Sequence, residues 1–310
     1  MVLIDRWKRP LLNLRIAVTQ TCNLGCPYCH MEGEVASNFT REMSAEEIAR
    51  IAKVAVKLGI SKMKITGGEP LMRKDITEIV HGIAATSGLN ELSMTTNGTM
   101  LADLAKELYA SGLKRVNISL PTLNSGTYRA LTGGRLENAL EGVRAAVEAG
   151  LHPVKLNMLI LKGVNDDAVS EMMEFASKVG AILQLIELEP LNLNMAYYYE
   201  HYKSLDEYEE MLRQKAVKIE TRKYMQDRHV YHLPDVTVEI VHPIENTSFC
   251  ANCTRLRLTS DGKLKPCLMR NDNLVDVLTP MRNGASDDEL IELFKLANQR
   301  REPYNQIKAQ

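Results

Sequence analysis

Three cysteines on one short loop constrain this chain more than any other feature of its sequence. Cys22, Cys26 and Cys29 are spaced C-x3-C-x2-C, and they follow a β-like stretch at residues 14–19. Three thiolates on a tight loop can hold three corners of a four-iron cluster, whereas iron–sulfur clusters usually take four cysteine ligands. The fourth iron would then stay open to bind and activate a ligand. The spacing therefore favours a reactive iron–sulfur site.

The remaining cysteines form a second group. Cys250, Cys253 and Cys267 are spaced C-x2-C-x13-C, so all six cysteines fall into two triads. Zinc is the alternative interpretation, but structural zinc sites usually take four protein ligands. His30 could complete the first triad, whereas no histidine lies within the run of the second. Two four-iron clusters, each with an exogenous fourth ligand, account for both triads in the same way.

Composition narrows the classes of function. The 310 residues suffice for one large α/β barrel or two modest domains. The formal net charge of −1 provides no basic field for nucleic acid, and no stretch approaches the ~20 apolar residues of a membrane span. Asn13 and Arg15 interrupt the apolar run that a signal peptide needs, so we expect a cytoplasmic protein in a reducing compartment. Clustered cysteines in such a compartment favour metal binding over disulfides.

Strand-like and helix-like segments alternate over the first 190 residues. The expected strands are 14–19, 62–66, 92–95, 115–120, 154–161 and 182–188, and the expected helices are 44–58, 75–85, 101–110, 136–149 and 167–179. Ser44 and Glu47 form a capping-box pattern at the first helix. The alternation predicts an α/β fold with a parallel sheet and helices outside it. Six units are too few for a closed barrel, so we favour an incomplete (β/α)6 TIM-type barrel over a doubly wound open sheet.

The pattern changes after Pro190, so we expect one domain at residues 1–190 and a second at residues 191–310. The expected elements of the second domain are helices 205–217 and 287–298 and strands 236–241, 256–259 and 263–265. The Ser-Asp-Gly-Lys run at residues 260–263 is typical of a hairpin turn. Cys253 and Cys267 flank this hairpin. The second domain is therefore expected to be a smaller α+β unit that carries the second metal site and caps the barrel.

Three motifs follow the first three strands. The cysteine loop follows the first, Gly67-Gly68-Glu69-Pro70 the second, and Asn97-Gly98 the third. Ligands of parallel α/β folds bind at the carboxyl ends of the strands, which is where all three motifs lie. We therefore expect the motifs to build one site.

These motifs resemble those of the radical S-adenosylmethionine (SAM) superfamily. The superfamily signature is C-x3-C-x2-C with an aromatic residue, here Tyr28, before the last cysteine, and the Gly-Gly-Glu-Pro run looks like its motif for the SAM amino group. Within the superfamily, nearly the whole chain is similar to the GTP 3′,8-cyclase family of molybdenum cofactor biosynthesis. The segments that carry this similarity are Lys62-x-Lys64-Ile-Thr-Gly-Gly-Glu-Pro-Leu, Thr95-Thr-Asn-Gly98, Lys155-x-Asn157, Lys162-Gly-x-Asn165-Asp, and Phe249-Cys-x2-Cys-Thr-Arg-x-Arg257-x2-Ser260-Asp-Gly-Lys.

The resemblance implies a lyase that uses two [4Fe-4S] clusters and SAM. The first cluster would chelate SAM, and one electron would cleave SAM to methionine and a 5′-deoxyadenosyl radical. In the family this radical removes the ribose 3′ hydrogen of GTP, and closure onto guanine C8 gives 3′,8-cyclo-7,8-dihydro-GTP. The implied partners are GTP, a one-electron donor and a downstream cyclic pyranopterin monophosphate synthase, and a homodimer is a further expectation. No nucleic acid or membrane partner is expected.

The resemblance also implies roles for individual residues. Cys22, Cys26 and Cys29 would hold the first cluster, and Cys250, Cys253 and Cys267 the second. The implied SAM-binding residues are Tyr28, Gly67, Gly68, Glu69, Asn97, Ser119 and Lys155, and the implied GTP-binding residues are Arg15, Lys62, Lys64, Thr95, Arg255 and Arg257. The arginines and lysines suit a triphosphate, which requires fixed cations.

Four departures from the family pattern stand out. Gln20-Thr21 precedes the first cysteine where Asp-Arg is common, Pro121 follows Ser119-Leu120 in place of aspartate, and Gln184 replaces a common arginine. The chain ends in Lys308-Ala309-Gln310 instead of Gly-Gly, as in archaeal-type members. The alternatives are another two-cluster radical SAM enzyme, for example a peptide-modifying one, and a zinc-stabilised binding module.

Overall fold

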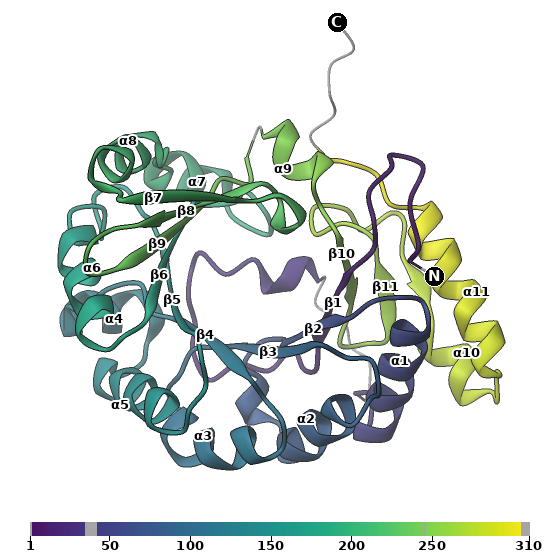
Figure 1. The fold of residues 1–310 in the computed structure, drawn as a ribbon. Helices are drawn as coiled ribbons and strands as arrows, with labels where there is room; N and C mark the ends of the chain where they lie inside the picture. Colours follow the sequence, from purple (N-terminus) through teal and green to yellow (C-terminus); the bar gives the residue numbers. More distant parts are fainter. Residues whose placement is uncertain (1, 35–41, 245, 305–310) are drawn as a thin grey trace, which may run out of the picture.

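A computed structural model describes residues 2–34, 42–244 and 246–304. The predicted tail, Lys308-Ala309-Gln310, lies outside these residues. The strands of the N-terminal part are β1 (Asn13–Ala17), β2 (Lys62–Thr66), β3 (Glu91–Thr96), β4 (Arg115–Ser119), β5 (Val154–Leu159) and β6 (Ile182–Ile186). They pair in sequence order, and every pair is parallel. A doubly wound sheet would reverse its order at one point, so the fold is the predicted partial barrel (Figure 1).

Helices cover the outside of this curved sheet (Figure 1). They are α1 (Ala45–Lys57), α2 (Ile76–Ala84), α3 (Leu101–Ala110), α4 (Ser125–Thr132), α5 (Leu136–Glu148) and α6 (Val169–Lys178). The Ser44–Glu47 capping box at α1 is confirmed, since each side chain accepts a hydrogen bond from the backbone N–H of the other residue. Only α4 was not predicted, because its eight residues, SGTYRALT, carry too few apolar positions to show a helical period.

The C-terminal part extends the same sheet at both edges. The additional strands are β7 (Lys218–Arg222), β8 (Arg228–His232), β9 (Thr237–Val241), β10 (Arg255–Leu258), β11 (Lys263–Lys265) and β12 (Val275–Asp276). Strand β9 pairs parallel to β6, and β10 pairs parallel to β1, so eight neighbouring strands of the described sheet are parallel. The predicted hairpin is the antiparallel pair β10–β11. The division into two domains at residue 190 stays a prediction.

Short elements complete the described chain. They are α7 (Met195–His201), α8 (Asp206–Lys215), α9 (Thr247–Ala251), α10 (Leu278–Arg282), α11 (Asp287–Gln299) and the 3-10 turns η1 (Met31–Gly33), η2 (Pro70–Met72) and η3 (Lys223–Met225). One apolar cluster joins the sheet to its helices, with Leu14, Ile16 and Ile65 fully buried. No helix in the described ranges is long and apolar enough to cross a membrane.

Candidate active site

One cavity of about 360 Å³ lies inside the partial barrel, and every predicted site residue lines it. These residues are Arg15, Cys22, Cys26, Tyr28, Cys29, Lys62, Lys64, Gly67, Gly68, Glu69, Thr95, Asn97, Ser119, Lys155, Cys250, Cys253, Arg255, Arg257 and Cys267. The alternation along the strands accounts for this, because Leu14 and Ile16 pack into the core beneath the helices while Arg15 points to the opposite face.

Neither cysteine triad has its three sulfurs gathered as closely as one zinc ion requires. A zinc ion bound by three thiolates needs their sulfurs within about 4.6 Å of one another, because each Zn–S bond is ~2.3 Å. Among the described residues, one set of three His, Cys, Asp or Glu ligand atoms lies within 4.8 Å, and it contains no cysteine. The sulfurs of each triad are therefore spread more widely than one zinc ion requires. This wider spacing is the kind that a larger metal group, such as a four-iron cluster, requires.

Hydrogen-bond donors and burial also distinguish the first triad. The backbone N–H of Leu24 donates to Cys22 Sγ at 3.5 Å, and that of Met31 donates to Cys29 Sγ at 3.4 Å. Burial raises the pKa of the Cys26 thiol to about 11; a hydrogen bond with Tyr28 opposes this, and Cys29 and Cys22 add to it. Burial raises the pKa of the Cys29 thiol as well, so these two thiols resist ionisation unless a cation neutralises them. The loop therefore suits a positively charged metal group.

Gly67 and Gly68 hold the cysteine loop against β2. The N–H of Gly68 donates to the carbonyl of Thr19 at 2.8 Å, and a Cβ on Gly68 would lie 2.3 Å from the carbonyl of Thr21. Gly67 also has φ +156°, and a Cβ there would lie 2.6 Å from the carbonyl of Thr19. The close approach that these glycines permit is to the chain itself. Their predicted contact with SAM stays a prediction.

Glu69 and Asn97 brace the same loop. Glu69 is 1% exposed and accepts hydrogen bonds from Thr96 Oγ1 at 2.6 Å and from the N–H of Asn97 at 2.6 Å. The amide of Asn97 in turn donates to Asn23 Oδ1 at 2.8 Å, inside the cysteine loop. Burial raises the pKa of Glu69 in spite of these bonds. The motifs after β1, β2 and β3 thus form one connected structure, as their shared position at the strand ends predicted.

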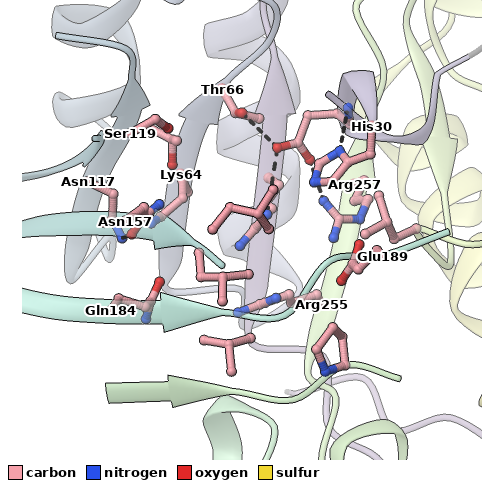
Figure 2. A pocket seen from close by; sticks show the side chains of 18 of the residues that line it. His30, Lys64, Thr66, Asn117, Ser119, Asn157, Gln184, Glu189, Arg255 and Arg257 are labelled. Carbon is pink, nitrogen blue, oxygen red and sulfur yellow. Dashed lines mark hydrogen bonds and ion pairs between the residues drawn. The ribbon is translucent and has the colours of Figure 1, made fainter. Parts of the chain in front are cut away.

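A row of cations faces the cavity across three neighbouring strands. In the sheet register, Arg15 of β1 lies beside Arg257 of β10 and beside Lys64 of β2. Burial, and then Arg15, lowers the pKa of Lys64 well below its usual value, while Asn117 accepts a hydrogen bond from its Nζ at 2.8 Å. Like charges directly opposite one another destabilise a sheet. The row therefore requires an anion. Figure 2 shows Lys64 toward the left of the pocket and Arg257 toward its right.

A carboxylate of the chain itself contacts this row. Glu32 accepts hydrogen bonds from Arg257 at 2.5 Å and from Thr66 at 2.9 Å, and it lies 3.7 Å from Arg15. Burial opposes its ionisation, but Arg257 and Arg15 outweigh that effect and lower its pKa to about 2. Glu32 has φ +52° and its neighbour Met31 φ +49°, a conformation that costs roughly 1–2 kcal/mol per residue for non-glycine residues. Sequence reasoning did not select Glu32, because nothing local marks a residue whose partners lie on distant strands.

Lys155 has an internal counter-ion. Its Nζ pairs with Glu239 of β9, which also accepts from Gln184 at 2.6 Å and pairs with Arg222 at 2.9 Å. Burial lowers the pKa of Lys155 to about 8 despite Glu239. The family resemblance implied that Lys155 binds SAM, and a buried lysine needs an anion. In the structure Glu239 provides that anion, and the contact between Lys155 and SAM stays a prediction.

The structure adds Arg228 to the cavity. It lies on β8 and is 8% exposed, and its Nε has no hydrogen-bond partner among the described residues. Burial lowers its pKa to about 10. Arg222 reaches the cavity from β7 in the same way. Sequence reasoning missed both, because β7 (KIETR) and β8 (RHVYH) are rich in charged and polar residues and do not show an apolar alternation.

The second triad surrounds the β10–β11 hairpin. Cys250 lies in α9, Cys253 precedes β10 and Cys267 follows β11. Burial raises the pKa of the Cys267 thiol. Burial acts the same way on Cys253, but Arg301 and then Arg255 outweigh it and lower its pKa. The surroundings of Cys253 therefore favour a thiolate, which is the form that binds metals.

At the rim, His242 joins two carboxylates. Its Nε2 lies 3.2 Å from Glu209 and its Nδ1 lies 3.6 Å from Glu187, while Tyr202 donates to Glu187 and His229 contacts Glu209. Burial lowers the pKa of His242, but the two carboxylates outweigh this and raise it to about 9. His242 thus bridges the end of β9, the end of β6 and α8.

This pairing gives a pH-dependent contribution to stability. The folded pKa of His242 is raised, so its stabilisation should be fully present below the ordinary value of about 6.5. It should fade as the pH rises through about 9. We therefore expect His242→Gln to lower the apparent melting temperature at pH 6 much more than at pH 10, measured by thermal unfolding of the two proteins at both values. An equal loss at both pH values would contradict the assignment.

Comparisons with known proteins match this geometry. A model of the Radical SAM superfamily matches residues 16–176, and one of Molybdenum Cofactor Synthesis C matches residues 181–307. The protein of Pyrococcus horikoshii named "Probable GTP 3′,8-cyclase" is 49% identical over 310 residues, which cover 98% of this chain and 98% of the relative. The protein of Methanocaldococcus jannaschii with the same name is 45% identical over 306 residues, covering 98% and 99%.

Solved structures are similar in fold. Streptococcus suis SuiB bound to S-adenosylmethionine has a TM-score of 0.62 and 20% sequence identity, covering 83% of this chain and 60% of that chain. The structure described as "Native anSMEcpe with bound AdoMet" has a TM-score of 0.62 and 17% identity, covering 92% and 82%. At these identities the likeness concerns the fold alone, and it agrees with the partial barrel.

Proposed function

Since the chain belongs to the GTP 3′,8-cyclase family of the radical SAM superfamily, we propose that it converts GTP to 3′,8-cyclo-7,8-dihydro-GTP in molybdenum cofactor biosynthesis. The observation that carries the proposal is that one cavity joins the two cysteine triads to the cation row of Arg15, Lys64 and Arg257. The triads suit two iron–sulfur clusters, and the row suits a triphosphate. The reaction needs both within reach of one substrate.

The first triad would hold the cluster that binds SAM. When bound, the cluster and SAM supply a 5′-deoxyadenosyl radical that removes a hydrogen atom from the substrate ribose. The chain itself shapes the site and orients the groups bound there. Gly67 and Gly68 press the loop onto β2, Glu69 and Asn97 fix its far side, and Tyr28 packs against an apolar cluster beside the cavity.

The cation row would bind the triphosphate. Arg15 and Arg257 lie side by side in the register, and Arg255 lies two residues before Arg257 on β10. Arginine forks bind phosphate oxygens in pairs, which fixes orientation as well as charge. Lys62, Lys64 and Thr95 line the same cavity. With the phosphates held here, the guanine would extend toward the second triad and its cluster.

Glu32 would compete with the phosphates for the row. Its carboxylate pairs with Arg257 and Arg15, so GTP must displace it before those guanidiniums become available. We expect Glu32→Gln to bind GTP about threefold to tenfold more tightly, because a charge-assisted contact is worth ~1.5–3 kcal/mol and only part of it is recovered. The ligand-free variant should melt at a lower temperature, because the buried Arg257 and the half-buried Arg15 lose their counter-ion.

A neighbouring glutamate provides the control for this prediction. Glu34 accepts hydrogen bonds from Ser260 at 2.6 Å and 3.0 Å, and it forms no ion pair with an arginine among the described residues. Glu34→Gln should therefore leave the GTP affinity unchanged. Equilibrium binding of GTP to both variants, measured by calorimetry, is the test. Weaker binding by Glu32→Gln would mean that Glu32 assists GTP instead of competing with it.

The function is tested by anaerobic turnover. The reconstituted protein is incubated with SAM, a reductant and GTP, and products are identified by mass spectrometry. The proposal predicts methionine, 5′-deoxyadenosine and a cyclised nucleotide isomeric with GTP. SAM cleavage without any change in GTP would favour a radical SAM enzyme with another substrate, such as a peptide. The cation row is the observation that favours a phosphorylated substrate over a peptide.

The proposed partners follow from the same chemistry. The reaction requires a one-electron donor, and its product requires an enzyme that rearranges the cyclised nucleotide to cyclic pyranopterin monophosphate. We propose both as cytoplasmic partners, together with a homodimer. Size-exclusion chromatography with light scattering of the purified protein tests the dimer.

A further inference from the structure

A buried group of three charged residues lies outside the roles assigned so far. Asp5, Arg9 and Arg301 come from opposite ends of the chain, and Arg9 and Arg301 are 4% and 1% exposed. Asp5 Oδ2 lies 2.8 Å from Arg9 Nε and 3.3 Å from Arg301 NH1. Arg301 NH1 also donates to the carbonyl of Arg9 at 3.2 Å. Two guanidiniums and one carboxylate leave this group with a net positive charge.

Both arginines reach the second cysteine triad. Arg9 NH1 donates to the carbonyl of Cys250 at 3.0 Å, and Arg301 NH2 donates to the carbonyl of Cys253 at 2.6 Å. The Nε of Arg301 is buried and has no hydrogen-bond partner in the described part of the chain. Each guanidinium therefore fixes the backbone of one cysteine, and Arg301 keeps one donor unused.

Burying these three charges costs folding free energy, so a purely structural role explains them poorly. Buried ions lose their hydration, and apolar side chains of similar volume often stabilise a fold as well or better. A net charge beside a ligand loop has a further effect when that loop holds an iron–sulfur cluster. The reduced cluster carries one more negative charge than the oxidised one, so a fixed positive charge nearby stabilises the reduced form. Net charge and hydrogen bonds around the ligands are among the factors that set the potential of such clusters.

We propose that Arg9 and Arg301, held together by Asp5, are positioning residues for the second cluster, which orient the Cys250–Cys253 ligand loop and raise the reduction potential of the cluster. The proposal rests on the proposed function, in which this triad binds a four-iron cluster. It predicts a cluster that accepts an electron more readily than the same ligand loop would allow without the two arginines.

The test isolates the second cluster. Alanine at Cys22, Cys26 and Cys29 removes the first ligand set, and the full-length protein is reconstituted with iron and sulfide. Its reduction potential is then measured by redox titration followed by electron paramagnetic resonance. In this background Arg301→Gln should shift the potential to a more negative value, and Arg301→Lys, which keeps the charge, should recover most of the shift.

Arg300→Gln is the matched control. Arg300 is the adjacent arginine, but it is exposed and donates to the carbonyl of Leu274 at 2.7 Å. Its loss should leave the potential unchanged. Should Arg301→Gln fail to fold, Arg9→Gln provides the same measurement through Cys250. If the Arg301→Gln or Arg9→Gln protein binds iron but keeps the unaltered potential and spectrum, this inference is overturned and the proposed function is not affected. A triple-alanine protein that binds no iron would overturn the second cluster of the proposed function, and the inference with it.

Discussion

Replacing Cys26 with serine should abolish SAM cleavage and remove about half of the bound iron, because one of two four-iron clusters then loses a thiolate ligand. Cys26 is the middle cysteine of the first triad, and its loop is held between β1 and β2. The serine hydroxyl has nearly the same size but is a far weaker ligand for iron. We expect 5′-deoxyadenosine formation to fall below detection in an anaerobic assay with excess reductant.

The matched variant is Cys253→Ser in the second triad. It should lose a similar amount of iron but still cleave SAM, because the first triad is intact. Without the second cluster to hold the guanine, GTP should not be cyclised. The two variants thus separate radical formation from use of the radical. If Cys26→Ser kept full SAM cleavage, or if both variants behaved alike, the assignment of different roles to the two triads would be wrong.

The second large effect concerns Arg255, which combines burial with the lack of a carboxylate partner among the described residues. It is 8% exposed, and no hydrogen bond or ion pair holds its guanidinium within the described residues. Burial, and then Arg15 and Arg228, lowers the pKa of Arg255 well below its usual value. An unpaired buried charge destabilises a protein. A phosphate that binds here would relieve that cost.

Arg255→Gln should therefore have two effects of opposite sign. GTP should bind about 10–100-fold more weakly, because a hydrogen bond to a charged group is worth ~1.5–3 kcal/mol and 1.4 kcal/mol is tenfold in affinity. The ligand-free protein should melt at a higher temperature, because the repulsion with Arg15 and Arg228 is reduced. Calorimetric titration with GTP and thermal unfolding without it measure the two effects.

Arg257→Gln is the control for this signature. Arg257 also lines the cavity, but it is paired with Glu32 in the absence of ligand. Its loss should weaken GTP binding and also lower the melting temperature, because Glu32 loses its closest counter-ion and keeps only the longer contact with Arg15. Unchanged GTP affinity in both variants would remove the triphosphate from this part of the cavity.

The sequence predicted the parallel strands within a few residues, and the reason is physical. These strands are covered by helices on one side and line the cavity on the other, so apolar residues alternate with polar or charged ones along most of them. Arg15 between Leu14 and Ile16, and Lys64 between Met63 and Ile65, are the clearest cases. Their place beside one another could be predicted from the period of two and the order of the strands.

Other features depend on contacts that leave no local signal. The pair Lys155–Glu239 joins residues 84 positions apart, and Glu239 lies in a strand whose place beside β6 no pattern indicated. Gln184 was read as the loss of a cation, whereas its amide holds Glu239. Glu32 turns toward Arg257 through a backbone conformation that its residue type disfavours. The counter-ions of the cavity could therefore not be assigned from the sequence.

The most direct test of the central claim is anaerobic turnover with GTP deuterated at C3′, followed by mass analysis of the 5′-deoxyadenosine. The account predicts that deuterium moves from the ribose into 5′-deoxyadenosine, because the cation row holds GTP with its sugar beside the first triad. Formation of 5′-deoxyadenosine without deuterium would contradict the account, because the radical would then take its hydrogen from a position other than C3′ of GTP.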